Sequence, residues 1–319
     1  MAPLGLSALR SLLRRSPRPQ AWTPPEASWS RPFGLGWDQP YTVRYASNLD
    51  DGPWHGMPLG GFGAGCIGRS SRGDFNLWHL DGGEHWYGTI PDCQFSLFEN
   101  NGSSKRAHAL ALKPEADASR SNSGEPLAAW NWYPASTGEQ STGTYAARYP
   151  LSWTHYEGVF DAEVQCEAFS PILPGDYQRT SYPVAVFRWT LRNPTDQPLD
   201  LSLLLSWRNT VGWFFNTDPS AEVHFRDDGS PEHNYAPAIG YGEGQRNRWL
   251  DQEGMRGIVL EGQRSEPIGE GQGQWCLAVP DTLDGVEVLR CSRWDPTGDG
   301  QELWQPFAAE GRIPNSNND

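Results

Sequence analysis

The stretch FDAEVQCEA, residues 160–168, alternates strictly between apolar and polar side chains. Every even-numbered residue in it is apolar, and every odd-numbered residue is an acid or an amide. A period of two places these two sets on opposite faces of an extended chain, whereas a helix would mix them. The stretch therefore predicts a β-strand with one face on a core and the other toward solvent.

Two stretches farther along the chain have the same period. They are AVFRWTL, residues 185–191, and LDLSLLLSW, residues 199–207. The residues between them, RNPTDQP, are rich in the types that form turns, so we predict a hairpin of two paired strands. Further strands are expected over residues 92–99, 256–261, 274–279 and 285–292. The apolar period typical of amphipathic helices is nearly absent.

Glycine and proline separate these short strands throughout the chain. The sequence has 35 glycines and 27 prolines among 319 residues. Short strands with frequent turn residues are typical of sandwiches and barrels. We therefore predict an all-β protein: an antiparallel β-sandwich of two large sheets, with long loops and few helices. The long loops are expected at residues 113–126, 136–143 and 226–247.

The charge balance argues against a nucleic-acid partner. The chain has 39 acidic and 25 basic residues and a net charge of −14, whereas phosphate backbones are bound by clustered cations. No run of about 18 apolar residues is present, so no transmembrane segment is expected. The five cysteines are odd in number and form no C-x-x-C pair, which favours a reducing compartment. We expect a cytoplasmic protein, or one peripheral to a membrane, without a cofactor or a metal.

The first 37 residues differ in composition from the rest. They begin MAPLGLSALRSLLRRSPRPQ, in which arginines interrupt the leucines, so a secretory signal is not expected. Their arginine and serine content is similar to that of a transit peptide, which stays an alternative. We predict a disordered or weakly helical leader over residues 1–37, a folded domain over 38–313, and the start of a linker over 314–319.

The glycines of PLGGFGAGCIG, residues 58–68, match the G-x-G-x-x-G pattern of dinucleotide-binding loops. That pattern binds pyrophosphate only between a parallel strand and the N-terminus of a helix. The residues that follow, RSSRGDF, include another glycine and have no helical period. Nucleotide binding is therefore not expected. We predict instead that the glycines let another segment of the chain pass close by.

Two other clusters have both a chemical and a structural interpretation. The segment HLDGGEH, residues 79–85, has carboxylate and imidazole groups, but its histidines are six residues apart. That spacing matches no usual metal site, so a polar loop is predicted. The 16 tryptophans include the clusters WNWY, residues 130–133, and WFF, residues 213–215. Indoles stack on sugar rings and also fill cores and interfaces; we predict the second role and keep the first open.

Several longer motifs follow one another along the chain: GMPLGGFGAGCIGRSSRGDFNLWHL, CQFSLF, RYPLSWTHYEG, SPILPGDYQRTSYPVAVFRWTLRN, LSWRNTVG and WDPTGDGQELWQPFAAEGRI. Over about residues 38–313 they resemble the N-terminal domain of the bile-acid β-glucosidase or non-lysosomal glucosylceramidase family, glycoside hydrolase family 116. The matching residues of the first motif are Pro58, Leu59, Gly60, Gly61, Gly63, Gly68, Arg69, Gly73, Phe75 and Trp78.

The resemblance implies a β-sandwich that precedes an (α/α)6 catalytic domain. In the family that second domain carries the acidic pair that cleaves β-glucosides with retention. No residue of this chain matches the pair, so no catalytic residue is carried over. The expected partner is the (α/α)6 domain, in the same chain or another, and through it a β-glucoside or glucosylceramide substrate. The chain ends at IPNSNND, where the resemblance places the start of that domain, so a truncated or split enzyme is expected.

Four residues near the glycine-rich segment are the candidates for contact with a substrate or a partner: Arg69, Trp78, Asp92 and Gln94. Three functions remain open. The favoured one is a non-catalytic domain that packs on a glucosidase catalytic domain and shapes its site. The second is a stand-alone carbohydrate-binding β-sandwich without hydrolase activity. The third is a hydrolase whose carboxylate pair the sequence does not reveal.

Overall fold

The structure is a computed structural model. It describes residues 22–35, 56–81, 84–87, 89–114, 127–211, 224–225, 231–232, 245–262, 273–281, 283, 285–295 and 298–317. Three predicted features lie wholly or largely outside these residues: the WFF cluster at 213–215 and most of the long loops at 113–126 and 226–247. The third predicted loop, 136–143, is free of regular structure until residue 143, where a strand begins.

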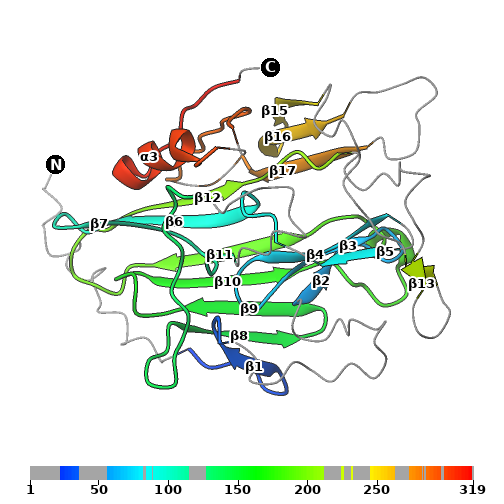
Figure 1. The fold of residues 1–319 in the computed structure, drawn as a ribbon, viewed down its shortest axis with the longest axis horizontal. Helices are drawn as coiled ribbons and strands as arrows, with labels where there is room; N and C mark the ends of the chain where they lie inside the picture. Colours follow the sequence, from blue (N-terminus) through cyan, green and yellow to red (C-terminus); the bar gives the residue numbers. More distant parts are fainter. Residues whose placement is uncertain are drawn as a thin grey trace, which may run out of the picture.

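The largest sheet among the described strands has five strands in the order β1-β8-β9-β10-β11, all antiparallel to their neighbours (Figure 1). The strands are β1 (Trp29–Pro32), β8 (Gly143–Arg148), β9 (Leu151–Tyr156), β10 (Glu163–Phe169) and β11 (Val186–Arg192). The stretch that opened the sequence analysis forms β10, and its apolar residues Val164 and Cys166 are buried while their neighbours are half-buried. The predicted strand and its inward face are therefore confirmed.

A second sheet has the order β12-β6-β7. It consists of β6 (Gln94–Asn100), β7 (Lys105–Ala109) and β12 (Asp200–Ser206). The predicted hairpin between residues 185–191 and 199–207 is wrong, because β11 pairs with β10 while β12 pairs with β6. The reason lies in the run Leu203–Leu204–Leu205, which interrupts the period of two. Leu205 packs on one core and Leu204 on another, so β12 needs cover on both faces.

Two further antiparallel sheets have the orders β2-β3-β4-β5 and β15-β16-β17. Their strands are β2 (Met57–Leu59), β3 (Cys66–Arg69), β4 (Phe75–Asp81), β5 (Glu84–Tyr87), β15 (Arg246–Gln252), β16 (Met255–Glu261) and β17 (Gln274–Pro280). A short pair, β13 (His224–Phe225) and β14 (Pro231–Glu232), completes the described strands. The all-β, antiparallel prediction is confirmed, although the described strands divide among five sheets rather than two.

Two hydrophobic cores lie on opposite faces of β6. Leu97 belongs to the first core, together with Val164 of β10 and Phe75 of β4. Phe98 belongs to the second core, together with Phe307 of the helix α3 (Gln301–Glu310). Figure 1 accordingly shows α3 above the sheet β12-β6-β7, with the five-stranded sheet below it. The strand β6 is therefore covered on both faces, which explains its nearly continuous burial.

The helix α3 was not predicted from the sequence. It contains Pro306, and it begins after Gly300, which has a φ of 73° and gives no side-chain cap. Proline and glycine both argue against a helix when the sequence is considered alone. The helix forms because Leu303, Trp304 and Phe307 fill the second core, and tertiary packing outweighs local preference. Neither described helix is long and apolar enough to cross a membrane.

Both predicted ends of the domain need correction. Residues 29–32 form β1, and Phe33 is fully buried, so the folded part begins within the expected leader of residues 1–37. At the other end, the predicted linker over 314–319 is held in place through Asn315 and Ser316. The amide of Arg290 donates to Asn315 Oδ1 (3.0 Å), and the amide of Ser316 donates to the Arg290 carbonyl (2.9 Å). Residues 1–21, 36–37 and 318–319 lie outside the described residues.

The strand predicted over residues 285–292 is also wrong. Within the described structure this segment makes only an isolated parallel bridge, between Cys291 and Ser316. Its alternating side chains are exposed or half-buried up to Cys291. The segment has the strand period, but this isolated bridge is its only strand-type pairing among the described residues, and one bridge is too short to count as a strand.

The carboxylate of Glu261 on β16 gives the fold a pH-dependent contact. Its side chain is 7% exposed and accepts hydrogen bonds from Arg246 Nε (2.9 Å) and Arg248 Nε (3.2 Å). Burial tends to raise the pKa of Glu261, but the two arginines outweigh it, and the pKa lies below its usual value. A carboxyl group whose pKa is lower in the folded state stabilises the fold above its unfolded pKa and loses this effect as the pH falls.

We therefore expect Glu261→Gln to lower the free energy of unfolding by about 1 kcal/mol at pH 7, a modest value because both arginines are partly exposed. The difference from the wild-type protein should vanish as the pH falls from about 4.5 through the folded pKa, where Glu261 itself becomes protonated. Urea unfolding at pH 7, 5 and 3 measures this. A difference that stays constant over this range would show that the arginines do not lower the pKa.

Candidate functional site

The glycine-rich segment forms a β-hairpin. Strand β2 pairs antiparallel with β3, with Met57 opposite Arg69 and Leu59 opposite Ile67. Gly63 and Gly65 lie in the loop between these strands, and Gly68 lies within β3. Strand β3 then pairs with β4 instead of leading into a helix. The geometry that a pyrophosphate needs is therefore missing, as expected from the sequence.

The hairpin loop is held against residues 170–184, which connect β10 to β11. The Gly60 amide donates to Ser170 Oγ (2.7 Å), and the Phe62 amide donates to the Thr180 carbonyl (2.9 Å). A Cβ atom at Gly61 would overlap the carbonyl oxygens of Ser181 and Tyr182. The prediction that the glycine-rich segment lets another segment pass close by is confirmed at Gly61, whereas Gly63 has no atom within 4 Å of an added Cβ.

The connecting segment is itself fixed by local hydrogen bonds. It contains the short helix α2 (Tyr177–Thr180), whose first turn is capped by Asp176 Oδ1, which accepts from the Arg179 amide (2.9 Å). Thr180 Oγ1 accepts from the Leu173 amide (2.9 Å). Ser170 Oγ, which accepts from the hairpin loop, donates in turn to the Val184 carbonyl (2.7 Å). These hydrogen bonds fix the hairpin loop and the connecting segment relative to each other, although neither is paired as a strand.

These two loops expose an unusual amount of apolar side chain. Phe62 is 61% exposed, Tyr177 80% and Tyr182 52%, and Leu173 and Val184 are each more than one third exposed. Single exposed apolar residues are common, but several large ones on joined segments are typical of an interaction site. We call Phe62, Leu173, Tyr177, Tyr182 and Val184 the loop surface. Because its backbone is fixed by hydrogen bonds, little ordering would be needed on binding.

Arg69, the first predicted contact residue, is 3% exposed and lies inside the domain. Its Nη2 donates to Tyr156 Oη (2.5 Å) and to the Leu110 carbonyl (3.1 Å). Its guanidinium carbon lies 5.5 Å from the ring centre of Phe95 and 5.6 Å from that of Trp189. Burial raises the pKa of the Tyr156 hydroxyl to about 12, with Arg69 acting in the opposite direction. Arg69 therefore joins β3 to the five-stranded sheet.

The other three predicted residues are buried as well. Trp78 is fully buried, with its ring centre 5.6 Å from that of Trp207. Asp92 is 1% exposed and forms a two-bond ion pair with Arg208, Oδ2 to Nε at 2.6 Å and Oδ1 to Nη2 at 3.0 Å. Burial raises the pKa of Asp92, while Arg208 acts against this rise. Gln94 is fully buried, and its amide atoms have no hydrogen-bond partner among the described residues.

The four residues thus lie behind the surface rather than on it. Their role in contact with a substrate or a partner stays a prediction, and their observed contacts are within the domain. Phe62, Tyr177 and Tyr182 were not among the contact residues predicted from the sequence. A usable signal was present in the turn residues around them: Phe62 lies between glycines, Tyr182 between Ser181 and Pro183, and Tyr177 two residues after Gly175.

Metal and thiol chemistry find no support in the described part of the chain. No group of three or more potential metal ligands occurs there, and the side chains of residues 81–85 in the HLDGGEH segment lie outside the description. All five cysteines are free thiols. Burial raises the pKa of Cys93 well above its usual value and that of Cys166 to about 12, so neither forms a thiolate nucleophile at neutral pH.

A comparison with protein families shows which family the chain belongs to. The family described as "beta-glucosidase 2, glycosyl-hydrolase family 116 N-term" matches residues 56–319, which is most of the chain. The chain belongs to this family. The family 116 N-terminal match begins just before β2 and includes both loops that form the loop surface. It also extends through α3 and the C-terminal segment, in agreement with the correction of the domain end.

Proposed function

We propose that this protein is a non-catalytic N-terminal domain that packs on the (α/α)6 catalytic domain of a family 116 β-glucosidase or glucosylceramidase and shapes its glucoside site. The catalytic domain lies in the same natural chain or in a separate one. The family match supports an association with a catalytic domain. The observation that carries the proposal is the loop surface, on which Phe62, Tyr177 and Tyr182 are more than half exposed.

The loop surface combines apolar side chains with a fixed backbone. Stable interfaces bury about 800 Å² on each partner, with apolar and aromatic residues at their centre. The loop surface offers these residues on a backbone held by the hydrogen bonds from Gly60 and Phe62. By contrast, the buried Asp92 and Arg69 are engaged inside the domain. The loop surface is therefore suited to docking, whereas Asp92 and Arg69 stabilise the fold.

The test is association with a separately produced catalytic domain of a family 116 enzyme. We expect the triple variant Phe62→Ser, Tyr177→Ser, Tyr182→Ser to bind at least about 30-fold more weakly than the wild-type domain, because buried aromatic residues dominate such interfaces. Tyr149→Ser is the matched control, since Tyr149 is 59% exposed on the turn between β8 and β9. Calorimetry or sedimentation measures the affinity, and hydrolysis of an aryl β-glucoside by the complex measures the effect on the site.

Two results would contradict the proposal. One is equal binding by the triple variant and the wild-type domain, which would place the interface elsewhere. The other is hydrolysis of the aryl β-glucoside by the pure chain, which would make it an enzyme in its own right. Circular dichroism of the triple variant separates loss of docking from loss of folding.

The cellular compartment is a further part of the proposal. We propose a cytoplasmic protein, free or peripheral to a membrane, because all five cysteines are free thiols and disulfides are rare in reducing compartments. Fractionation of cells that produce the full natural protein tests this. Recovery in the secretory pathway would contradict it.

A further inference from the structure

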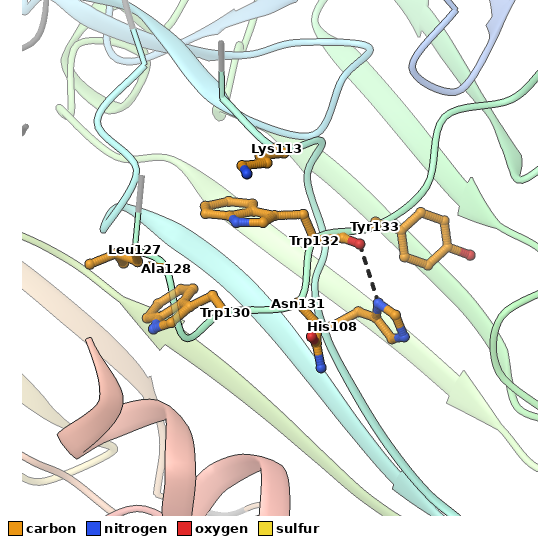
Figure 2. Close-up of a pocket in the computed structure, with 8 residues that line it drawn as sticks. All are labelled: His108, Lys113, Leu127, Ala128, Trp130, Asn131, Trp132 and Tyr133. Carbon is orange, nitrogen blue, oxygen red and sulfur yellow. Dashed lines mark hydrogen bonds between the residues drawn. The ribbon is translucent and has the colours of Figure 1, made fainter. Parts of the chain in front are cut away.

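A cavity of about 430 Å³ opens at the edge of β7, away from the loop surface in sequence. Figure 2 shows the side chains that line it, which come from residues 108–113 and 127–133. The lining includes His108, Lys113, Leu127, Trp130, Asn131 and Trp132. The volume lies within the usual range of small-molecule sites, and the lining combines aromatic and polar groups as such sites do.

One wall of the cavity is an indole fixed by an aromatic stack. Trp130 is 4% exposed, and its ring centre lies 5.1 Å from that of Trp304 and 6.1 Å from that of Trp294, with nearly parallel planes. Its Nε1 donates to the Gly300 carbonyl (3.3 Å). The core role predicted for the tryptophan cluster is therefore correct for Trp130, which packs the C-terminal helix onto the sheet.

Trp132 differs from Trp130, although the two rings lie only 6.0 Å apart. It is half-buried, and it is held by a bridge to Ala109 of β7. In Figure 2 its indole points to the same side as that of Trp130, toward Leu127. Trp132 therefore presents a partly exposed aromatic face, and its backbone is held by the bridge to Ala109.

Polar side chains also line the cavity, with Lys113 beside the Trp132 indole and with Asn131 and His108 on the other side of residues 130–133 (Figure 2). The exposed Lys113 lines the same cavity, and its ammonium has no ion-pair partner among the described residues. Asn131 Nδ2 donates to the Ala107 carbonyl (3.4 Å), which leaves Asn131 Oδ1 as an acceptor. His108 Nδ1 lies 3.3 Å from the Trp132 carbonyl and donates to it. Burial lowers the pKa of His108, so at neutral pH its Nε2 is an acceptor.

This combination selects one class of ligand. A polyanion is disfavoured by a single lysine in a chain of net charge −14. A purely apolar ligand would make no use of the Lys113 ammonium beside Trp132. A hydroxylated ring matches both features, because its C–H face packs on an indole while its hydroxyl groups bond to the donors and acceptors around it. We propose that this cavity binds a neutral pyranose ring, with Trp132 beneath the ring and Lys113 bonded to its hydroxyl groups.

Titration of the whole chain with methyl β-D-glucoside and with cellobiose tests the proposal, with intrinsic tryptophan fluorescence and calorimetry as readouts. We expect saturable binding with a Kd of about 1 mM for the wild-type chain and at least about tenfold weaker binding for Trp132→Ala. Trp132→Phe should retain most of the affinity, because an aromatic face remains. Lys113→Ala should weaken binding about threefold.

Trp22→Ala is the matched control, because Trp22 is another half-buried indole, stacked on His155 at 5.1 Å. It should bind the sugars as the wild-type chain does, and so should the triple loop-surface variant. The proposal is overturned by absence of saturable binding to the wild-type chain at tens of millimolar sugar. It is equally overturned by undiminished binding in Trp132→Ala, or by equal binding of sorbitol, an open-chain polyol that has no ring face.

Discussion

Replacing Asp92 by alanine is expected to lower the free energy of unfolding by about 3–5 kcal/mol, the largest effect of any single change considered for this protein. The carboxylate is 1% exposed and holds Arg208, whose side chain is only 12% exposed, through two hydrogen bonds. Removing it leaves a buried guanidinium without its carboxylate, and water cannot replace that interaction at low cost. Urea unfolding monitored by tryptophan fluorescence measures the change.

The control is a surface pair with the same two-bond geometry. Glu287 accepts from Arg312 Nη1 (2.7 Å) and Nη2 (2.8 Å), but both side chains are more than half exposed. Glu287→Ala should therefore leave the unfolding transition almost unchanged. If Asp92→Ala is also neutral for stability but abolishes the response to a glucoside when the catalytic domain is present, the original assignment of Asp92 to a functional contact is right.

Replacing Gly61 by alanine is expected to lower the free energy of unfolding by about 3 kcal/mol and to weaken docking at the loop surface. The added Cβ atom would overlap backbone carbonyls of Ser181 and Tyr182, which cannot swing aside as a side chain can. The hairpin loop and the connecting segment must then separate, and Phe62 and Tyr182 move with them. Urea unfolding and binding of the catalytic domain measure the two effects.

Gly63→Ala is the matched control for Gly61→Ala. Gly63 lies in the same loop with a φ of 73°, but no atom lies within 4 Å of an added Cβ. Alanine there should cost only the strain of a left-handed backbone, about 1 kcal/mol, and should leave docking intact. Equal losses for the two variants would mean that backbone strain, rather than contact with residues 181–182, determines the need for glycine.

The fold could be predicted from the sequence where one face of a strand is buried. The alternation in β10 and β11 gave both the strand and its inward face, because Val164 and Cys166 alternate with polar neighbours. Periodicity indicates a face but not a partner, which is why β12 was wrongly paired with β11. It also fails for α3, where Pro306 lies inside a helix that forms because Trp304 and Phe307 fill a core.

The candidate site shows a different limit. The role of the glycines was predictable, because Gly-rich segments without a following helix allow close backbone approach. The choice of Arg69, Trp78, Asp92 and Gln94 followed from their nearness to that segment in sequence, yet all four are at most 3% exposed. Polar residues within an alternating strand are normally taken to face solvent. The fold instead covers β3 and β6 on both faces, so their polar residues are buried too. Which strands are covered on both faces depends on how the sheets stack, and the local sequence does not indicate this.

The central position of β6 has a consequence for how the chain folds. Its two neighbours are β7, only a few residues away, and β12, whose Ser206 pairs with Gln94 across more than 100 residues of sequence. Long-range pairing of this kind slows folding. During synthesis at roughly 5–20 residues per second, one edge of β6 stays unpaired for roughly 5–20 s. A strand with the large apolar side chains Phe95, Leu97 and Phe98 and an open edge is prone to aggregate. The yield of soluble protein should therefore depend on chaperones and growth temperature more than on equilibrium stability.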